Sequence, residues 1–370
     1  MDADGVFEYV PAACRACVYP DHAASSVLAQ PASTRVACVT GVEVSHASEP
    51  PSASAVLLSD NTRLPCDYLL LATGSSYAAP IKAKPEQGAG VHARRAHYRQ
   101  VCTRLEAAPS ALVVGGGTVG VELAAEIAAK WGRKKHVTLV AAQPVLLERL
   151  PPRAGRFVAE WLRRAGVDLV LGERVTDWGG ADVAGWGVPG SWHVRTSTGR
   201  SIHAAAVFNC AGAKPATAYL RSVKGALNAQ GAIATLPSLR LKALCNAYAA
   251  GDAAAHGAEC TALTADLTAS LAAANILAAS RGIALASFPQ GVCHGALTVP
   301  DIAAVSLGPY NGVLVFNQLV VRGPPVAAIK WTIENLQLAT AKGQALPGAL
   351  WSGIEAANVY LGGKLWRAKA

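Results

Sequence analysis

One stretch limits what this chain can fold into more than any other. It reads Ala-Leu-Val-Val-Gly-Gly-Gly-Thr-Val-Gly-Val-Glu over residues 111–122. Its apolar start, without a polar interruption, predicts a strand that is buried on both faces. The strand leads into a G-x-G-x-x-G pattern at Gly115, Gly117 and Gly120. The Ala- and Glu-rich residues 123–130 then favour a helix.

Strand, glycine turn and helix in this order are the fingerprint of a dinucleotide-binding βαβ unit. The glycines permit a tight turn and let a pyrophosphate approach the backbone, and the helix N-terminus offers unpaired N–H groups to the anion. A second apolar strand is expected over residues 136–140, at the spacing that such a unit requires. The alternative is a glycine-rich turn in another kind of α/β protein.

Composition excludes several classes of protein. The chain has 370 residues, enough for two domains, and only 15% of them are charged, so disorder is not expected. The net charge is +9, but the basic residues are scattered, apart from Arg133-Lys134-Lys135, and no aromatic residues alternate with them. We therefore expect no nucleic-acid partner. The positive charge suits anionic cofactors or an acidic membrane surface.

The nine cysteines form no disulfide framework and indicate a reducing compartment. Cys14 and Cys17 make a C-x-x-C, which is either a redox pair or an incidental spacing, and no thioredoxin-like unit surrounds it. No second cysteine pair completes a zinc site, and the histidines are isolated and expected mostly in loops. We expect no metal site.

No signal peptide opens the chain, because Met1-Asp2-Ala3-Asp4 is acidic where a basic segment belongs. No uninterrupted apolar window reaches 18 residues. The nearest, residues 260–279, contains Asp266, several threonines and an asparagine, and is expected to be a buried helix. These features favour a cytoplasmic protein.

Three further apolar strands end in small-residue turns. They cover residues 65–74, 206–215 and 246–254 and end in Ala-Thr-Gly, Cys-Ala-Gly and Ala-Gly-Asp. The acid of the last turn, Asp252, precedes a long Ala/Leu helix. It is either the N-cap of that helix or a carboxylate directed at a ligand hydroxyl.

The end of the second fingerprint strand bears on the choice of coenzyme. An NAD-preferring unit usually has an acid there to hold the ribose 2′-hydroxyl, but this chain has Ala141-Ala142-Gln143. Basic residues close by in sequence could pair with a 2′-phosphate instead, namely Lys130, Arg133, Lys134 and Arg149. NADPH is therefore allowed, and the choice between NADH and NADPH stays open.

In this order, the motifs make the chain resemble the flavoprotein oxidoreductases with two dinucleotide folds. It is most similar to the ferroptosis-suppressor branch of apoptosis-inducing-factor-like proteins, which are related to type II NADH dehydrogenases. The segments that carry the resemblance span residues 1–330 and are Phe7-Glu8-Tyr9, residues 69–74, 113–122, 210–212 and 248–252, Ser306-Leu-Gly308 and Asn311-Gly312.

The resemblance implies an α/β fold with two Rossmann-like dinucleotide-binding domains and a small C-terminal α+β region. It divides the chain into four parts. Residues 1–105 are the first part of an FAD-binding domain, residues 106–215 the NAD(P)H-binding domain, residues 216–295 the second FAD part, and residues 296–370 the C-terminal domain. The implied activity passes electrons from NAD(P)H through FAD to a quinone or similar small acceptor, with the cofactor carrying the chemistry.

Carried over by position, several residues are implied to bind cofactor. Gly115, Gly117 and Gly120 would cradle the NAD(P)H pyrophosphate, and Glu122 would lie near the nicotinamide. No catalytic residue is otherwise identified. Residues implied to lie at the FAD are Asp252, Arg15, Val39 through its backbone, and Asp2, which falls where the family holds the FAD ribose. The strand ends that complete the implied binding set are Thr73, Gly74, Gly212 and Gly251.

The chain departs from the family at its start. The family begins with a strand–G-x-G-x-x-G–helix unit that binds FAD, and this sequence begins at about the end of that unit's second strand. We expect a truncated sequence, and the alternative is a flavin-less nucleotide-binding protein without catalysis. Glu259 also stands near where family members often have a lysine facing the flavin.

The C-terminal segment carries two apolar stripes. The first contains Ile329, Ile333 and Leu336, with Trp331 nearby, and the second contains Trp351, Ile354, Leu361 and Leu365. Lys364, Arg367 and Lys369 add positive charge near the end. Such a tail either lies in a membrane interface or packs on a domain surface or a second subunit. The oligomeric state stays open.

Overall fold

The fingerprint stretch forms the centre of a four-stranded parallel sheet. Strand β8 (Ser110–Val114) is followed by helix α4 (Thr118–Trp131) and strand β9 (His136–Ala141), which confirms the expected βαβ unit. The strand order is β10-β9-β8-β14, with β10 at Val167–Leu171 and β14 at Ala206–Asn209. All three neighbouring pairs are parallel. The strands therefore end at one common edge, where a doubly wound sheet binds its ligand.

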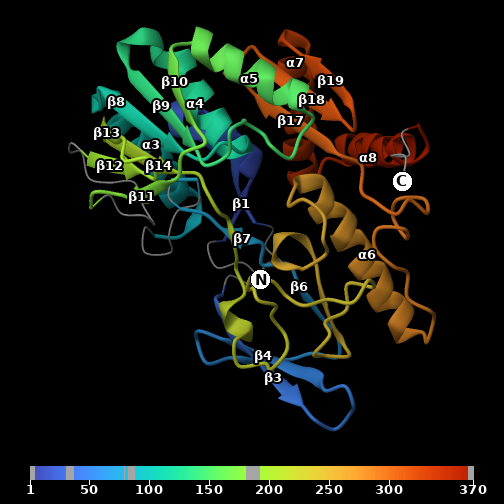
Figure 1. Cartoon of the computed structure of the whole chain (residues 1–370). Coiled ribbons are helices and arrows are strands. Elements are labelled where there is room, and N and C mark those ends of the chain that lie inside the picture. Colours follow the sequence, from blue (N-terminus) through green and yellow to red (C-terminus); the bar gives the residue numbers. More distant parts are fainter. Residues whose placement is uncertain (1–4, 31–36, 79, 82–87, 181–191, 366–370) are drawn as a thin grey trace.

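This computed structural model describes residues 5–30, 37–78, 80–81, 88–180 and 192–365. The parallel sheet, its helices and the C-terminal strands form an upper body in Figure 1, and strands β3, β4 and β6 lie in a lower body. Helix α6 (Ala262–Ser280) runs along the side of the lower body toward the upper one. The mixed α/β fold class is confirmed.

The two faces of the sheet are covered by different layers because neighbouring strand residues point to opposite sides. Val113 and Leu139 belong to the cluster beneath α4, whereas Leu112, Val114 and Val140 belong to a cluster on the other face. That second layer is a small antiparallel sheet of β11 (Val175–Asp177), β12 (Trp192–Thr196) and β13 (Ser201–Ala204). Helix α5 (Pro152–Arg164) packs beside α4 and β10.

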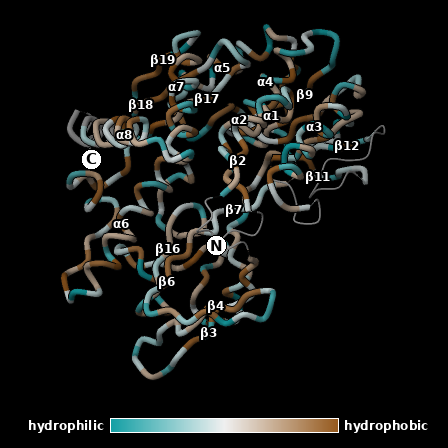
Figure 2. The backbone as a smooth tube through the Cα atoms, turned by 180° about the vertical axis from the view of Figure 1, so that it is seen from behind, coloured by the Kyte–Doolittle hydropathy of each residue, from teal (hydrophilic) through white to brown (hydrophobic). Residues whose placement is uncertain are grey.

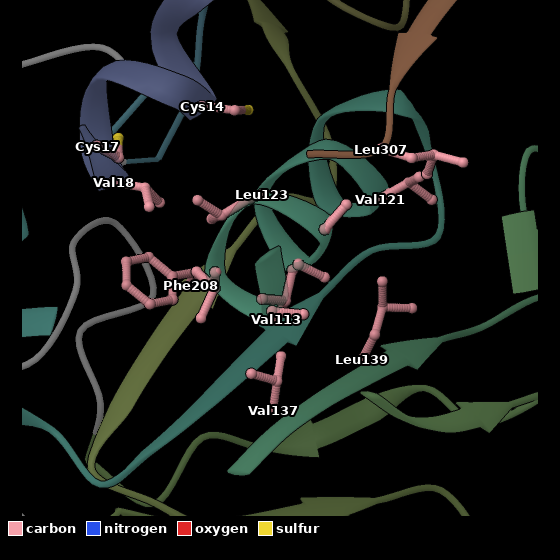
Figure 3. Packing of buried hydrophobic residues seen from close by; sticks show 14 of the residues in the cluster. Cys14, Cys17, Val18, Val113, Val121, Leu123, Val137, Leu139, Phe208 and Leu307 are labelled. Carbon is pink, nitrogen blue, oxygen red and sulfur yellow. The ribbon is translucent and has the colours of Figure 1, made fainter. Parts of the chain in front are cut away.

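The N-terminal helices complete the core of the upper body. Figure 3 shows Cys14, Cys17 and Val18 of α1 (Ala13–Val18) on the same side of the sheet as Leu123 and Phe208. These five side chains are at most 5% exposed and belong to one hydrophobic cluster. Nearby elements are α2 (His22–Ser26), α3 (Gly90–Ala107) and the antiparallel pair β1 (Val6–Glu8) and β2 (Val27–Ala29).

The lower body is built from two separate stretches of the chain. Strand β6 (Leu69–Leu71) pairs in parallel with β16 (Ala247–Ala249). An antiparallel sheet of β3 (Val39–Ser45), β4 (Ser52–Leu58) and β5 (Arg63–Pro65) lies at its far end (Figure 1). The two stretches meet again where β7 (Ser75–Ser76) pairs with β15 (Lys214–Pro215).

Two hydrophobic clusters account for most of the packing. The larger one joins α1, α3 and α4 with the parallel sheet and reaches Leu307 and Val313 near the C-terminus. The other joins Val42 and Leu71 with residues between 220 and 254. The first hundred residues thus contribute to both bodies. The domain boundaries expected from the resemblance stay a prediction.

The C-terminal part consists of three antiparallel strands and two helices. The strands are β17 (Ile302–Ser306), β18 (Gly312–Phe316) and β19 (Leu319–Arg322), and the helices are α7 (Pro324–Ala341) and α8 (Ala345–Leu365).

The buried side of α7 differs from the apolar stripe that the sequence suggests. It carries Val326, Glu334 and Leu338, whereas Ile329 is 39% and Trp331 64% exposed. Two charged residues can occupy the inner side because each has a partner there. Lys330 contacts Glu122, and the His22 ring nitrogen lies 2.7 Å from a Glu334 carboxylate oxygen. Local periodicity cannot reveal such partners.

The expectation that α6 is a buried helix is wrong for most of its surface. The helix is long and apolar enough, by length and composition, to cross a membrane, and 28% of that window is buried. Its buried side includes polar Thr264, Thr268 and Asn275. Asn275 donates to the backbone of Ser238 and Ala286 at 2.9 and 2.8 Å. Asn275 thus faces the protein because it has backbone partners there.

Candidate functional site

A cavity of about 1000 Å³ opens at the carboxyl ends of the parallel strands. Its first wall comprises the glycine turn 115–118 and the strand ends 140–143 and 209–212. Its second wall comprises residues 256–261 and Thr264, at the start of α6, together with residues 297–303. The cavity therefore lies between the parallel sheet and the N-terminal end of α6.

The glycine turn has the geometry of a pyrophosphate cradle. Gly115 has a φ of +130°, and a Cβ atom there would stand 2.9 Å from the Cys210 carbonyl. A Cβ atom at Gly120 would overlap the carbonyl oxygen of Gly115, so helix α4 can approach the turn only if this position is glycine. Gly117 precedes the first residue of α4 and lines the cavity. The open helix N-terminus thus faces the cavity.

The sequence suggested four basic residues for a coenzyme phosphate, and the structure separates them. Lys130 lies away from the cavity and contacts Glu106 at 3.1 Å. Arg149 lines the cavity, but its guanidinium pairs with Glu259 at 2.7 Å. Arg133 and Lys134 follow α4 at its far end and are not among the residues that line the cavity. The lining contains Arg174 and Trp178 instead, which flank strand β11 in a stretch that carries no motif.

Glu122 is turned away from the cavity wall. Its carboxylate contacts Lys330 of α7 and accepts from the Ser306 backbone N–H at 2.8 Å. Glu122 is 8% exposed and is absent from the residues that line the cavity. Its expected place near a nicotinamide stays a prediction.

A second ion pair lies one helical turn further along α4. Arg15, which the resemblance placed at the FAD, donates to Glu126 at 2.9 Å and to the Gly308 carbonyl at 3.2 Å. Burial raises the pKa of Glu126, and the Arg15 charge opposes that shift. Arg15 thus joins α1, α4 and the turn that follows β17 in this structure.

The residues expected at the FAD gather beside the cavity rather than along it. Asp252 accepts a hydrogen bond from Ser75 at 2.6 Å, and Thr73 donates to the Ala216 carbonyl at 2.7 Å. Gly74 and Gly251 have φ values of +66° and +64°. The Gly251 N–H donates to Thr268 of α6 at 2.9 Å.

The structure excludes one of the two interpretations of Asp252, that of the N-cap, and its role at a ligand stays a prediction. The N-cap of α6 is Thr261, which accepts from the Thr264 N–H at 3.1 Å. Asp252 lies nine positions before it and is not the cap. Its charge raises the pKa of Cys260, after the larger effect of burial, which places it near the second wall of the cavity.

Two expected site residues lie elsewhere. Val39 pairs with Leu58 at the start of the β3–β4 ladder and does not line the cavity. Asp2 falls outside the described residues. Gly212, at the end of β14, does line the cavity.

The residues that the structure describes fit the two cofactors to different degrees. For a nicotinamide dinucleotide, the cradle, the strand ends and the cavity are all present. For FAD, the Gly251–Asp252 turn and the Thr73–Gly74 strand end are present. Among the described ranges, however, no second strand–glycine turn–helix unit cradles a flavin pyrophosphate. The fit to FAD is therefore partial.

The C-x-x-C lies inside the core. Cys14 and Cys17 are 5% and 0% exposed, and burial raises the pKa of both thiols well above the usual range. All nine cysteines are free thiols. The incidental interpretation is thus favoured. Sequence reasoning missed that Cys210 and Cys260 line the cavity, where burial raises the pKa of Cys210 to about 12.

The histidines are less isolated than expected. His136 lies on β9, and His193 and His203 face each other across the β12–β13 hairpin with ring centroids 4.1 Å apart. The two rings are in contact because the register of the hairpin pairs His193 with His203. Their separation in the sequence does not indicate this contact. Within the described ranges, no group of three or more His, Cys, Asp or Glu residues could hold a metal ion.

Comparison with known proteins places this geometry in a family. Residues 21–279 match the model of the pyridine nucleotide-disulphide oxidoreductases. The chain belongs to this family. The match covers the glycine turn, the parallel sheet and the α6 side of the cavity.

Curated relatives in the family narrow the comparison. The chain is 32% identical over 238 residues to human ferroptosis suppressor protein 1, which is 64% of this chain and 62% of that protein. It is 28% identical to the protein of the same name from Xenopus laevis over 321 residues, 86% of this chain and 81% of that protein. An FAD-dependent oxidoreductase, FVFD30 from Flammulina velutipes, is 30% identical over 230 residues, 61% of this chain and 67% of that protein. The chain thus aligns with less than two thirds of the human relative.

A solved structure shows the same fold. The sulfide:quinone oxidoreductase of Aquifex aeolicus superposes with a TM-score of 0.70, covering 92% of this chain and 84% of that one. Sequence identity is 13%, so the likeness concerns the fold alone.

Proposed function

We propose that this chain is an FAD-dependent NAD(P)H oxidoreductase that passes electrons to a quinone or similar small acceptor. The observation that carries the proposal is the glycine cradle of Gly115, Gly117 and Gly120. It opens into a cavity whose opposite wall is the start of α6. A dinucleotide held at the cradle would extend toward the side of the molecule where Asp252 lies.

The relatives support this proposal through their names. One is an FAD-dependent oxidoreductase, and the protein with the same fold is a sulfide:quinone oxidoreductase. Family membership favours a flavin and a nicotinamide nucleotide as the two cofactors. FAD, when bound, supplies the electron transfer chemistry, and the protein supplies binding and orientation.

The chain's own residues would act mainly by binding. The N–H groups at the start of α4 would hold the coenzyme pyrophosphate through hydrogen bonds and the helix dipole. Gly212 and Cys210, at the end of β14, would border the same ligand. The apolar residues Leu297, Val299 and Ile302 line the second wall and would limit access of water.

A specific observation favours the second candidate, a nucleotide-binding protein without flavin. The described residues hold one strand–glycine turn–helix cradle, and the nicotinamide nucleotide would occupy it. Helix α1, whose Arg15 the resemblance assigned to FAD, is fastened to α4 instead. In that case the chain binds NAD(P)H and retains no FAD.

We further propose that the protein is cytoplasmic and touches a membrane surface through its C-terminal helices. Leu346, Leu350 and Ile354 on α8 are 72%, 52% and 38% exposed, and their spacing places them on one side of the helix. An exposed apolar stripe of this kind suits a membrane interface, and a quinone acceptor would be reached there.

One experiment separates the two candidates. The purified 370-residue chain is incubated with excess FAD and desalted, and its visible absorption spectrum is recorded before and after NADPH or NADH is added without oxygen. Flavin bands that stay with the protein and bleach on addition support the oxidoreductase. A folded sample that binds NAD(P)H and keeps no flavin supports the second candidate and contradicts the first.

A further inference from the structure

The coenzyme end of β9 lies directly against the loop that follows β10. The Glu173 N–H donates to the Ala141 carbonyl at 3.1 Å, and the Gly172 N–H donates to the Gln143 carbonyl at 3.0 Å. In a dinucleotide fold, the end of this second strand adjoins the adenosine ribose. Residues 172–174 are therefore neighbours of the ribose 2′-position, although they are thirty residues away in sequence.

The acid in this loop also lines the cavity, but its carboxylate is already bound by neighbouring side chains. Glu173 is 8% exposed, and its carboxylate accepts hydrogen bonds from Thr196, from Thr198 at 2.7 Å and from Arg200 at 3.1 Å. The two threonine hydrogen bonds are the main reason that the pKa of Glu173 is lowered. A carboxylate with its acceptors engaged in this way is a poor partner for a ribose hydroxyl.

The next residue is a cation that faces the cavity. Arg174 is exposed and lines the cavity, and within the described ranges its guanidinium has neither an ion pair nor a hydrogen bond. Two hydrogen bonds with Ser197 fix the backbone of Arg174. The Arg174 N–H donates to the Ser197 Oγ at 3.2 Å, and the Ser197 N–H donates to the Arg174 carbonyl at 2.7 Å. The base of the side chain is thus placed firmly while the charged end is free to bind.

A flat apolar surface lines the same cavity at the other end of β11, which begins directly after Arg174. Trp178 is half-buried, packs against the cluster that includes Val194, and lines the cavity. An aromatic face of this kind can stack on an adenine ring. Cation and aromatic ring together match the two features of a 2′-phosphorylated adenosine.

Arg149 and Glu148 also line the cavity, and each is a weaker candidate than Arg174 for contact with the ribose 2′-position. Arg149 pairs with Glu259 at 2.7 Å, so its charge is already balanced. Glu148, the carboxylate that could favour a ribose hydroxyl, follows Leu147, whose N–H donates to the Gly116 carbonyl at 2.9 Å. Leu147 thus holds the backbone before Glu148 beside the glycine turn. The strand end itself presents uncharged Ala141, Ala142 and Gln143.

From this arrangement we propose that the site selects NADPH over NADH, with Arg174 binding the 2′-phosphate and Trp178 stacking on the adenine. The proposal rests on the proposed function only in that both use the same nucleotide cavity. A guanidinium and a phosphate form charge-assisted hydrogen bonds in paired geometry, which gives this contact both strength and specificity.

The test uses two nucleotide fragments that need no flavin. Isothermal titration calorimetry of the full chain with adenosine 2′,5′-bisphosphate and with adenosine 5′-monophosphate isolates the 2′-phosphate. We expect the bisphosphate to bind about tenfold tighter or more. Arg174→Ala should remove most of that difference and leave the monophosphate affinity unchanged. Trp178→Leu should weaken both fragments by a similar factor.

Two control variants show whether the loss in Arg174→Ala is specific to that residue. Arg195→Ala removes the same charge from β12, outside the cavity lining, and should leave the difference intact. Glu148→Gln should also leave the monophosphate affinity unchanged. Equal binding of the two fragments by the native chain, or tighter binding of the monophosphate, overturns the proposal and leaves the proposed function standing. Binding of neither fragment overturns both.

Discussion

Lys330 of α7 contacts the carboxylate of Glu122 on α4, 208 positions earlier in the chain. The two side chains are 15% and 11% exposed. Glu122 also accepts from the Ser306 backbone N–H, so one carboxylate joins helix α4 to both β17 and α7. The glycine fingerprint and the C-terminal region thus share a buried ion pair.

Removing one partner of this pair should destabilise the protein strongly. Glu122→Ala leaves Lys330 mostly buried without its partner, and breaking a buried pair in this way costs about 3–5 kcal/mol. Urea denaturation followed by circular dichroism measures the loss. Glu122→Ala combined with Lys330→Met should recover part of it. Glu160→Ala, from an exposed pair with Arg164, should cost at most about 1 kcal/mol. If Glu122→Ala and Glu160→Ala lower the free energy of unfolding equally, the role assigned to Glu122 is contradicted.

The glycine turn should not tolerate a methyl group at its helix contact. In Gly120→Ala the new Cβ overlaps the Gly115 carbonyl, so α4 must shift and its N-terminus leaves the pyrophosphate. We expect nucleotide affinity to fall by at least about tenfold, measured by calorimetry. Gly353→Ala is the control, because it also lies in a helix and has open space around it. It should stabilise the protein by up to about 1 kcal/mol and leave binding unchanged.

Docking of α8 on α6 should depend on pH. Burial, followed by the hydrogen bond with Asp266, raises the pKa of Glu355 to about 8 from an ordinary value near 4.5. The folded state therefore holds a proton that the unfolded state releases, and its contribution to stability is complete below about pH 4.5 and is lost as pH rises through 8. Both helices lie on the same side of the molecule in Figures 1 and 2, so this contact fastens the C-terminal helix.

Limited proteolysis between pH 6 and 9 measures this effect. Cleavage within α8 should accelerate as pH approaches 9, while cleavage of the β3–β4 loop, far from α8, should provide the reference (Figure 1). Asp266→Asn removes the second carboxylate and should flatten the pH dependence. A pH profile that is the same in this variant would show that the carboxyl pair does not control docking.

The proposed membrane contact depends on the exposed stripe of α8. Leu350→Asp places a charge in the middle of that stripe and should reduce co-sedimentation with vesicles of phosphatidylcholine and phosphatidylserine several-fold. Leu319→Asp, on β19, is a control of similar exposure away from α8. If both variants bind vesicles as the native chain does, the stripe is not a membrane surface.

Sequence alone predicted the elements whose causes are local. Strand β8, the glycine turn and α4 follow from apolar periodicity and from residues that must be glycine. Strands β14 and β16 likewise follow from short apolar runs.

The parts of the site that sequence did not reveal depend on contacts across the fold. The loop that holds Arg174 lies against the end of β9 only because β10 pairs with β9, and Glu122 contacts a partner 208 residues away. The inward side of α6 carries Thr268 and Asn275 beside apolar residues, and both polar side chains bind backbone outside the helix. Hydropathy alone cannot show which side of α6 faces the protein.

The nine free thiols divide by depth and by location. Cys38 and Cys260 are exposed, whereas Cys14, Cys17 and Cys102 are buried in the upper body and Cys293 is buried beside α6. A thiol-alkylating reagent should therefore mark Cys38 and Cys260 in the folded protein and reach the four buried thiols only when their surroundings open. The order in which Cys17 and Cys293 become labelled would record which body of the molecule unfolds first.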